Sequence, residues 1–227
     1  MSLGTYDIWG YGPFVSRRYA EFMAHTQGEH PDAVVLDIPF EKLHPLYIML
    51  RCKYYLTHEG GRLLQRARSP GYEEVVLVPE YEVIRDRDDI FAAMSEPDFD
   101  PSERVILEEE PRPVPAQDAR QGTARVMERG TDHLVIEAET LSPALLLVTD
   151  AYADGWKAHP LKGSSQERYQ VLPANYVLRG VPLEAGSHRI LMTYRPRGLI
   201  AGLIVSLVSL ALLAGATGLL LVRKRQR

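Results

Sequence analysis

The feature that most constrains this chain is a stretch of 25 residues without a charge, from Gly198 to Val222. A bilayer core about 30 Å thick needs roughly 20 apolar residues, because each helical residue adds about 1.5 Å. A buried core helix of this length would normally keep a polar face, and this stretch has none. We therefore predict a membrane-spanning helix over 198–222, with membrane lipid and the transmembrane helices of a larger protein or complex as partners.

Basic residues lie on both sides of this stretch and bear on its orientation. The tail 223–227 follows it directly with four positive charges, which is typical of a cytoplasmic end. Arg195 and Arg197 lie just before it, so the charge signal is mixed. We expect a location in the inner membrane of the cell, with the head extracytoplasmic and the C-terminus cytoplasmic.

The N-terminal residues bear on how such a head would be exported. Residues 1–24 contain no apolar run of about seven residues after a basic start, which is the pattern of a signal peptide. One explanation is that the chain is the C-terminal part of a longer membrane protein. The other is that it is tail-anchored, with its head in the cytoplasm. We expect the first.

The charge of the head excludes one class of partner. All 30 acidic residues lie before Gly198, and four of the 26 basic residues lie in the tail, which leaves 22 basic residues in the head. The head therefore has a formal charge of −8. Since nucleic-acid binding depends on basic patches that neutralise phosphates, we expect no nucleic acid as a partner.

A proline-rich segment divides the head into two parts. Three prolines stand within the run Pro111-Arg-Pro-Val-Pro115, which favours a stiff, extended linker over 111–116. Helical and strand patterns mix in 1–110, whereas 117–196 has seven short predicted strands with turn signals between them. The predicted fold class is α+β, with a mixed α/β domain over 1–110, an antiparallel β-sandwich over 117–196 and one C-terminal transmembrane helix.

Two helices are predicted in the first part. Val15, Tyr19 and Phe22 recur at helical spacing and predict a core-facing stripe, and Gly28 can end that helix in the left-handed conformation. The polar residues expected to face away from the core are Arg17, Arg18, Glu21 and His25. The second helix is expected from about 88 to 95.

The run Asp86-Arg87-Asp88 has two interpretations. It has the D-x-D form with which many nucleotide-sugar transferases hold a divalent cation, and hard cations prefer clustered carboxylates. The same aspartates can instead cap the helix over 88–95, where the dipole favours acidic residues. We expect capping, and predict no metal site and no cofactor.

The motifs of common catalytic sites do not occur in this sequence, which contains no G-x-S-x-G, H-E-x-x-H, Walker loop or C-x-x-C. No catalytic residue is predicted. Aromatic rings beside carboxylate, amide and guanidinium groups can bind sugars, since a sugar stacks on a ring while its hydroxyls bond the polar groups. The predicted glycan-binding residues are Asp150, Tyr152, Trp156, Asn175, Tyr176 and Arg179.

Trp156 also has a structural interpretation, in which its ring fills the sandwich core and Asp154–Gly155 forms a tight turn. We favour this interpretation for Trp156. For Tyr152 and Asn175 the choice between a structural and a binding role stays open.

Several runs of this sequence resemble one family. Gly155-Trp-Lys-Ala158, Ala174-Asn-Tyr176 and the run 186–196 stand in this order ahead of the uncharged stretch. Together they resemble the C-terminal region of the YfhO family of bacterial membrane proteins, which are similar to GT-C glycosyltransferases. Gly10-Tyr-Gly-Pro13 and Asp98-Phe-Asp-Pro101 also resemble the family, so the resemblance covers nearly the whole chain.

The resemblance implies an activity for a larger protein. GT-C-like proteins transfer a sugar from a lipid-linked donor, here to a cell-envelope glycan, and their catalytic acid lies in an early multi-span region that this sequence lacks. The chain also departs from the family at 161–167, where a longer segment replaces a tight Asp-Gly turn. No residue of this chain can inherit the catalytic role.

Three functions are therefore considered. The expected one is a non-catalytic accessory domain that binds or shapes an envelope glycan for the parent transferase. The alternative is a structural or interaction module that braces a membrane complex and binds no glycan. Small residues four apart, such as Gly198 and Gly202, fit this alternative because they let helices approach closely. The third, a tail-anchored cytoplasmic enzyme, is disfavoured because no catalytic motif is present.

Overall fold

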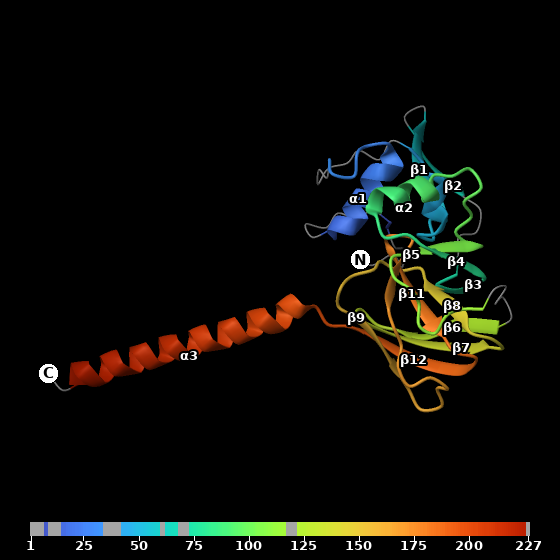
Figure 1. Ribbon diagram of the computed structural model, residues 1–227. Coiled ribbons are helices and arrows are strands. Elements are labelled where there is room, and N and C mark those ends of the chain that lie inside the picture. Colours follow the sequence, from blue (N-terminus) through green and yellow to red (C-terminus); the bar gives the residue numbers. More distant parts are fainter. Residues whose placement is uncertain are drawn as a thin grey trace.

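The computed structural model describes residues 7–8, 15–33, 42–59, 62–67, 73–116 and 122–225. Figure 1 shows a folded head and one long helix that projects from it. The helices in these ranges are α1 (Arg17–Gln27), the 3-10 helix η1 (Pro45–Ile48), α2 (Arg87–Met94) and α3 (Arg197–Arg225). The strands are β1 (Tyr54–Glu59), β2 (Arg62–Ala67), β3 (Val75–Val78), β4 (Glu80–Val83), β5 (Arg104–Leu107), β6 (Gly122–Arg129), β7 (His133–Thr140), β8 (Ala144–Val148), β9 (Trp156–Pro160), β10 (Leu172–Ala174), β11 (Leu178–Leu183) and β12 (Gly186–Tyr194).

Within these ranges the strands form three sheets. A six-stranded sheet has the order β3-β8-β11-β10-β5-β4, a four-stranded sheet has the order β6-β7-β12-β9, and β1 and β2 form a separate hairpin. Paired strands are antiparallel except β4, which runs parallel to β5.

The sequence of β8 explains how the layers are arranged. All five of its residues, Ala144–Val148, are buried, as a strand covered on both faces requires. Leu145 and Leu147 belong to a core cluster with side chains of α1 and α2. Leu146 and Val148 belong to a second cluster, which lies between the two larger sheets. The head therefore has three layers: helices, the six-stranded sheet and the four-stranded sheet (Figure 1).

This arrangement corrects the predicted fold class. The chain is mostly β, and strands on both sides of the proline-rich segment 111–116 share the six-stranded sheet. β3, β4 and β5 come from the predicted α/β domain over 1–110, and β8, β10 and β11 come from the predicted sandwich over 117–196. The local patterns missed this because hydrophobic periodicity identifies a strand but not its partner.

The C-terminal helix is a second correction. In the part of the chain that the structure describes, no helix has both the length and the apolar character needed to cross a membrane. That finding contradicts the predicted membrane-spanning helix over 198–222 and the description of the chain as a single-pass membrane protein. The predicted tail 223–227 is helical as far as Arg225, and 226–227 lie outside the described residues.

A buried histidine on β12 makes the stability of the head sensitive to pH. His188 is 2% exposed. Its Nε2 donates to the carbonyl oxygen of Glu184 at 2.9 Å, and its Nδ1 accepts from the hydroxyl of Tyr169 at 2.7 Å. A neutral ring with its proton on Nε2 satisfies both contacts. Burial lowers the pKa of His188 below its usual 6.5, and this outweighs the opposite effect of Glu184.

We predict that acid removes stability through His188. The unfolded chain takes up a proton on this ring as the pH falls through about 6.5, and the folded chain takes it up only at lower pH. Urea unfolding between pH 8 and pH 5 should show a smaller loss of stability in His188→Gln than in the parent. His159→Gln, an exposed position on β9, should keep the full loss. An unchanged pH dependence in His188→Gln would contradict this role.

Candidate functional site

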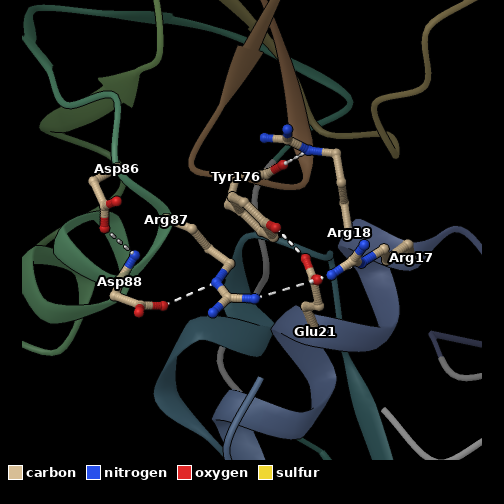
Figure 2. Close-up of a pocket in the computed structure, with 7 residues that line it drawn as sticks. All are labelled: Arg17, Arg18, Glu21, Asp86, Arg87, Asp88 and Tyr176. Carbon is tan, nitrogen blue, oxygen red and sulfur yellow. Dashed lines mark hydrogen bonds and ion pairs between the residues drawn. The ribbon is translucent and has the colours of Figure 1, made fainter. Parts of the chain in front are cut away.

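The candidate site lies where the N-terminal ends of α1 and α2 meet the turn between β10 and β11 (Figure 2). The side chain of Ser16 caps α1, and Gly28, with φ of 84°, ends it. The carboxylate of Asp86 caps α2 by accepting from the backbone N–H groups of Asp88 at 2.9 Å and Asp89 at 3.3 Å. The capping interpretation of these aspartates is confirmed. Among the described residues, no group of three or more His, Cys, Asp or Glu side chains could hold a metal ion.

A shallow pocket of about 430 Å³ opens between these elements (Figure 2). Its lining combines three guanidinium groups, three carboxylates and one phenol. These residues are Arg17, Arg18, Glu21, Asp86, Arg87, Asp88 and Tyr176. The lining is formally neutral and rich in hydrogen-bonding groups, so it suits a polar ligand better than an apolar one.

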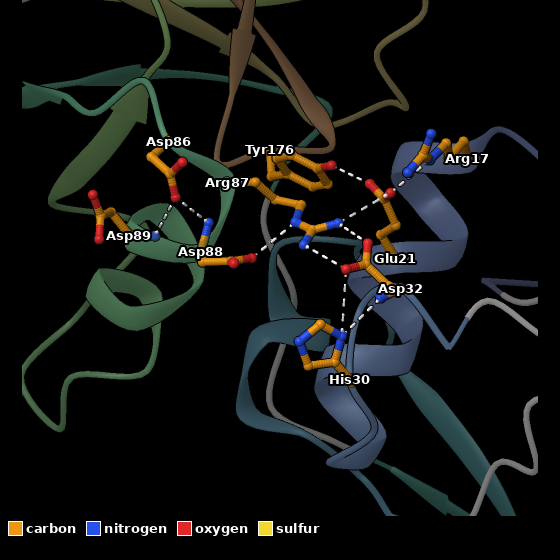
Figure 3. Close-up of polar contacts among 9 residues, drawn as sticks. All are labelled: Arg17, Glu21, His30, Asp32, Asp86, Arg87, Asp88, Asp89 and Tyr176. Atoms are coloured by element: carbon orange, nitrogen blue, oxygen red, sulfur yellow. Dashed lines mark hydrogen bonds and ion pairs between the residues drawn. The ribbon is translucent and has the colours of Figure 1, made fainter.

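Glu21 is the central acceptor of the pocket (Figure 3). It is only 3% exposed, and its carboxylate accepts from Arg17 Nε at 2.8 Å, from Arg87 Nη1 at 3.4 Å and from the hydroxyl of Tyr176. Burial raises the pKa of Tyr176 to about 12, and the hydrogen bond to Glu21 acts in the same direction. Arg87 also binds Asp32 at 2.5 Å. The buried carboxylate is therefore fully paired, as a buried charge must be.

Arg18 connects the pocket with the second half of the chain. Its Nε donates to the carbonyl oxygen of Tyr176 at 2.8 Å, and its guanidinium pairs with the carboxylate of Glu108. Its Cζ lies 4.2 Å from the ring centre of Tyr176 and 5.4 Å from that of Tyr152. Burial lowers the pKa of Arg18, although the neighbouring phenols and acids oppose this shift. One guanidinium thus holds both tyrosines by cation–π contacts.

A second charged group, here called the arginine cluster, consists of Arg51, Glu74, Arg129, Asp150 and Arg179. The carboxylate of Asp150 accepts from Arg51 Nη2 at 2.6 Å and from Arg129 Nη1 at 3.2 Å, and it forms an ion pair with Arg179 Nη2 at 3.1 Å. The carboxylate of Glu74 joins Arg51 at 2.9 Å and Arg129 at 2.8 Å. The cluster therefore ties together segments that lie far apart in the sequence.

Arg179 is the buried member of this cluster. It is 2% exposed, and its Cζ lies 4.0 Å from the ring centre of Trp156. Burial lowers the pKa of Arg179 to about 10, although Asp150 opposes the shift, so the side chain stays charged at neutral pH. Tyr194 packs against the same indole, with its ring centre 5.4 Å away. Trp156 also packs against the core between the sheets, so little of its ring is free for a sugar.

The six predicted glycan-binding residues fall into groups with different surroundings. Three lie in or beside the arginine cluster, where Arg179 contacts both Asp150 and Trp156. Two contact Arg18: Tyr152 and Tyr176. The ring of Tyr176 is also contacted by the edge of Phe91, at 4.8 Å between ring centres. Of the predicted aromatic residues, Tyr152 has the smallest number of ring contacts within the described part of the chain.

Asn175 supports the fold from inside. It is 0% exposed, its Oδ1 accepts from the backbone N–H of Ile106 at 2.8 Å, and its own backbone N–H donates to Ile106 at 2.8 Å. Asn175 and Tyr176 both have positive φ, at 44° and 64°, because they form the tight turn between β10 and β11. Asparagine adopts this conformation more readily than most residues, which explains its place here.

Sequence reasoning missed most of the charged residues at both sites. Arg18 and Glu21 were expected to face away from the core, yet Glu21 is buried under α2 and the β10–β11 turn. The spacing of Arg17 and Glu21, four residues apart, was a signal for their ion pair. No local signal marks the remaining members of the arginine cluster, because Arg51, Glu74 and Arg129 lie far apart in the sequence and meet only in the folded chain.

Comparison with known proteins gave no match: no family model fits this chain, and neither a curated protein nor a solved structure resembles it significantly. The resemblance to the YfhO family therefore stays a prediction.

We predict that neutralising the central acceptor weakens the head. Glu21→Gln keeps the shape of the side chain but leaves Arg17 and Arg87 without a buried counter-charge, so the free energy of unfolding should fall by about 1–3 kcal/mol. Glu29→Gln, an exposed position with the same change in charge, should leave stability unchanged. Both are measured by urea unfolding, and an equal effect of the two substitutions would argue against the central role of Glu21.

Proposed function

We propose that this chain is a non-catalytic accessory module that binds the helices of a partner protein along α3. The observation that carries this proposal is the exposed apolar surface of that helix, which projects from the head (Figure 1). Its large apolar side chains are 54% to 70% exposed: Leu203, Ile204, Val205, Leu207, Val208, Leu210, Leu212 and Leu213. Covering each of them is worth about 1.5–3 kcal/mol, so the driving force for association is large.

The distribution of these side chains indicates the shape of the partner. At about 100° per residue, they occupy the whole circumference of α3 rather than one stripe. A helix that is apolar all round is normally enclosed by other apolar elements. A flat groove would cover only one side, so the partner we propose supplies helices on at least two sides of α3.

The polar and small residues of α3 support a helical partner. Ser209 donates its hydroxyl to the carbonyl oxygen of Val205 at 2.9 Å, and Thr217 donates to that of Leu213 at 2.8 Å. These hydroxyl protons are therefore satisfied within the helix. A Cβ built on Gly202 or on Gly215 would meet no atom within 4 Å, and such small positions let a second helix approach closely.

The resemblance to the YfhO family supports a more specific context. We propose that the partner transfers sugars to glycans of the cell envelope, and that this chain contributes binding and positioning rather than the chemical step. Two features fit a positioning role: the head has three packed layers with buried ion pairs, and β12 leads into α3 after two intervening residues.

Site-specific photo-crosslinking in the cells that make the full chain tests this function. A photoreactive amino acid at Leu207 or at Leu212 probes two sides of α3 roughly 140° apart. Both positions should crosslink to apolar helical segments of one other protein, mapped by mass spectrometry. The matched control is Leu141, which is 76% exposed but lies on the head, and it should give no such product.

Three results would count against a helical partner. Crosslinking from both α3 positions to lipid alone would replace the partner with a lipid surface. Crosslinking to Leu207 or Leu212 of a second copy would replace it with a self-associated chain. The same products from Leu141 as from α3 would show that the reaction does not depend on the apolar surface.

A second candidate function is glycan contact at Tyr152. The side chain of Tyr152 is partly exposed, its hydroxyl lies 3.3 Å from Asp154 Oδ1, and Arg18 joins it to the polar pocket. A sugar stacked on this ring would reach hydrogen-bonding groups on both sides. Trp156 and Tyr176 offer less, because protein side chains cover their rings.

Titration of the full chain with a glucose trisaccharide and an N-acetylglucosamine trisaccharide, each at millimolar concentration, tests this second function. Tyr152→Ala should weaken binding by about tenfold, which is the value of one stacking contact. Tyr54→Ala removes a tyrosine that is 59% exposed on β1 and should have no effect. Absence of binding in the parent, or equal losses in both variants, would exclude a glycan site at Tyr152.

A further inference from the structure

We propose that the arginine cluster is a binding site for a small monovalent anion of the size of chloride or a carboxylate. This inference is independent of the partner of α3. It combines three observations, which are an excess of positive charge, a buried donor without an acceptor, and a partly exposed acidic side chain, that of Glu74, among the acceptors.

The charge within the cluster does not balance. Arg51, Arg129 and Arg179 carry three positive charges, and Asp150 and Glu74 carry two negative charges. One positive charge therefore remains at a site where Arg179 is 2% exposed. A buried charge without a counter-charge is unfavourable, because water cannot solvate it and the interior does not replace that solvation.

A hydrogen-bond donor in the same place has no acceptor. Nη2 of Arg179 forms an ion pair with the carboxylate of Asp150 at 3.1 Å, and its Nε donates to the carbonyl oxygen of Asp150 at 3.3 Å. Its Nη1 is buried and has no hydrogen-bond partner among the described residues. Buried donors are nearly always paired, so an unpaired guanidinium nitrogen indicates an acceptor from outside the chain. An anion would satisfy both the donor and the excess charge, whereas a water molecule would satisfy only the donor.

The outer side of the cluster gives a route for entry. The side chain of Glu74 is 41% exposed and that of Arg129 is 29% exposed, against 2% for Arg179. Glu74 is the most exposed acceptor, and it holds two of the guanidinium groups. Movement of Glu74 into solvent would open the cluster to an anion, so Glu74 competes with the ligand.

The excess of one charge selects the class of ligand. A chloride or a carboxylate brings one negative charge and leaves the cluster neutral. A phosphate dianion would bring more charge than the cluster lacks, and its extra charge would have to stay partly desolvated. Both carboxylate oxygens of Asp150 already contact guanidinium groups of the cluster, so a carboxylate is a ligand class that these groups bind.

Trp156 provides the signal for a test. The full chain is titrated with sodium acetate or sodium chloride to about 0.1 M, while indole fluorescence and the thermal unfolding midpoint are recorded. Because the guanidinium of Arg179 lies 4.0 Å from the indole centre, anion binding should change the fluorescence in a saturable way and raise the midpoint. Trp156→Phe should remove the fluorescence change and keep the rise in midpoint.

Matched variants separate a site from general screening by salt. Arg129→Gln removes the excess charge and should weaken binding by about tenfold or more. Glu74→Gln removes the competing carboxylate and should tighten binding by about threefold or more. Arg125→Gln makes the same change in charge on the same strand, at a side chain that is 71% exposed and pairs with Glu137, and should behave like the parent.

Four outcomes would overturn the proposal. They are a response that does not saturate with either anion, equal effects of Arg129→Gln and Arg125→Gln, weaker binding in Glu74→Gln, and saturation with sodium phosphate but not with acetate or chloride.

Discussion

β8 carries helices on one face and a second sheet on the other, and the rest of the head is organised around this double burial. Its residues alternate between two cores, with Leu145 and Leu147 towards α1 and α2, and Leu146 and Val148 towards the four-stranded sheet. Because β8 pairs with β3 on one side and with β11 on the other, it draws both halves of the chain into one sheet. α1 and α2 pack on this sheet and on each other, and the N-terminal ends of both helices meet the β10–β11 turn at the polar pocket.

The two charged sites show different ways of burying charge. In the pocket, Glu21 is nearly inaccessible, and three donors from two helices and a turn surround it. In the arginine cluster three guanidinium groups share two carboxylates, and the buried guanidinium of Arg179 lies next to the indole ring of Trp156. The first arrangement is complete without a ligand, whereas the second leaves a donor that only an added acceptor can satisfy. A cation–π contact with the indole face stabilises the guanidinium of Arg179 and offsets part of the cost of burying its positive charge.

The sequence was sufficient to predict local features such as helix caps, but not the pairing of strands that are far apart in the chain. The cap at Asp86 and the end of α1 at Gly28 follow from side-chain chemistry within a few residues, and both predictions are confirmed. The pairing of β3 with β8 joins segments about 70 residues apart, for which periodicity gives no signal. The same limit explains Glu21, since a helical wheel places it on the polar face of α1 and only the packing of Arg87 and Tyr176 against it buries it.

Length and apolar composition suggested a membrane-spanning helix at 198–222, and the described part of α3 does not meet that criterion.

The connection between β12 and α3 has a mechanical consequence. β12 is an inner strand of the four-stranded sheet, held by β7 on one side and by β9 on the other, and it runs into the helix within three residues. A pull along α3 is therefore transmitted along the axis of β12. Hydrogen bonds in an antiparallel ladder lie across the strands, so such a load shears the bonds of both ladders together instead of opening them one at a time. We therefore expect that more force is needed to unfold the head by pulling on α3 than by separating an edge strand from its sheet.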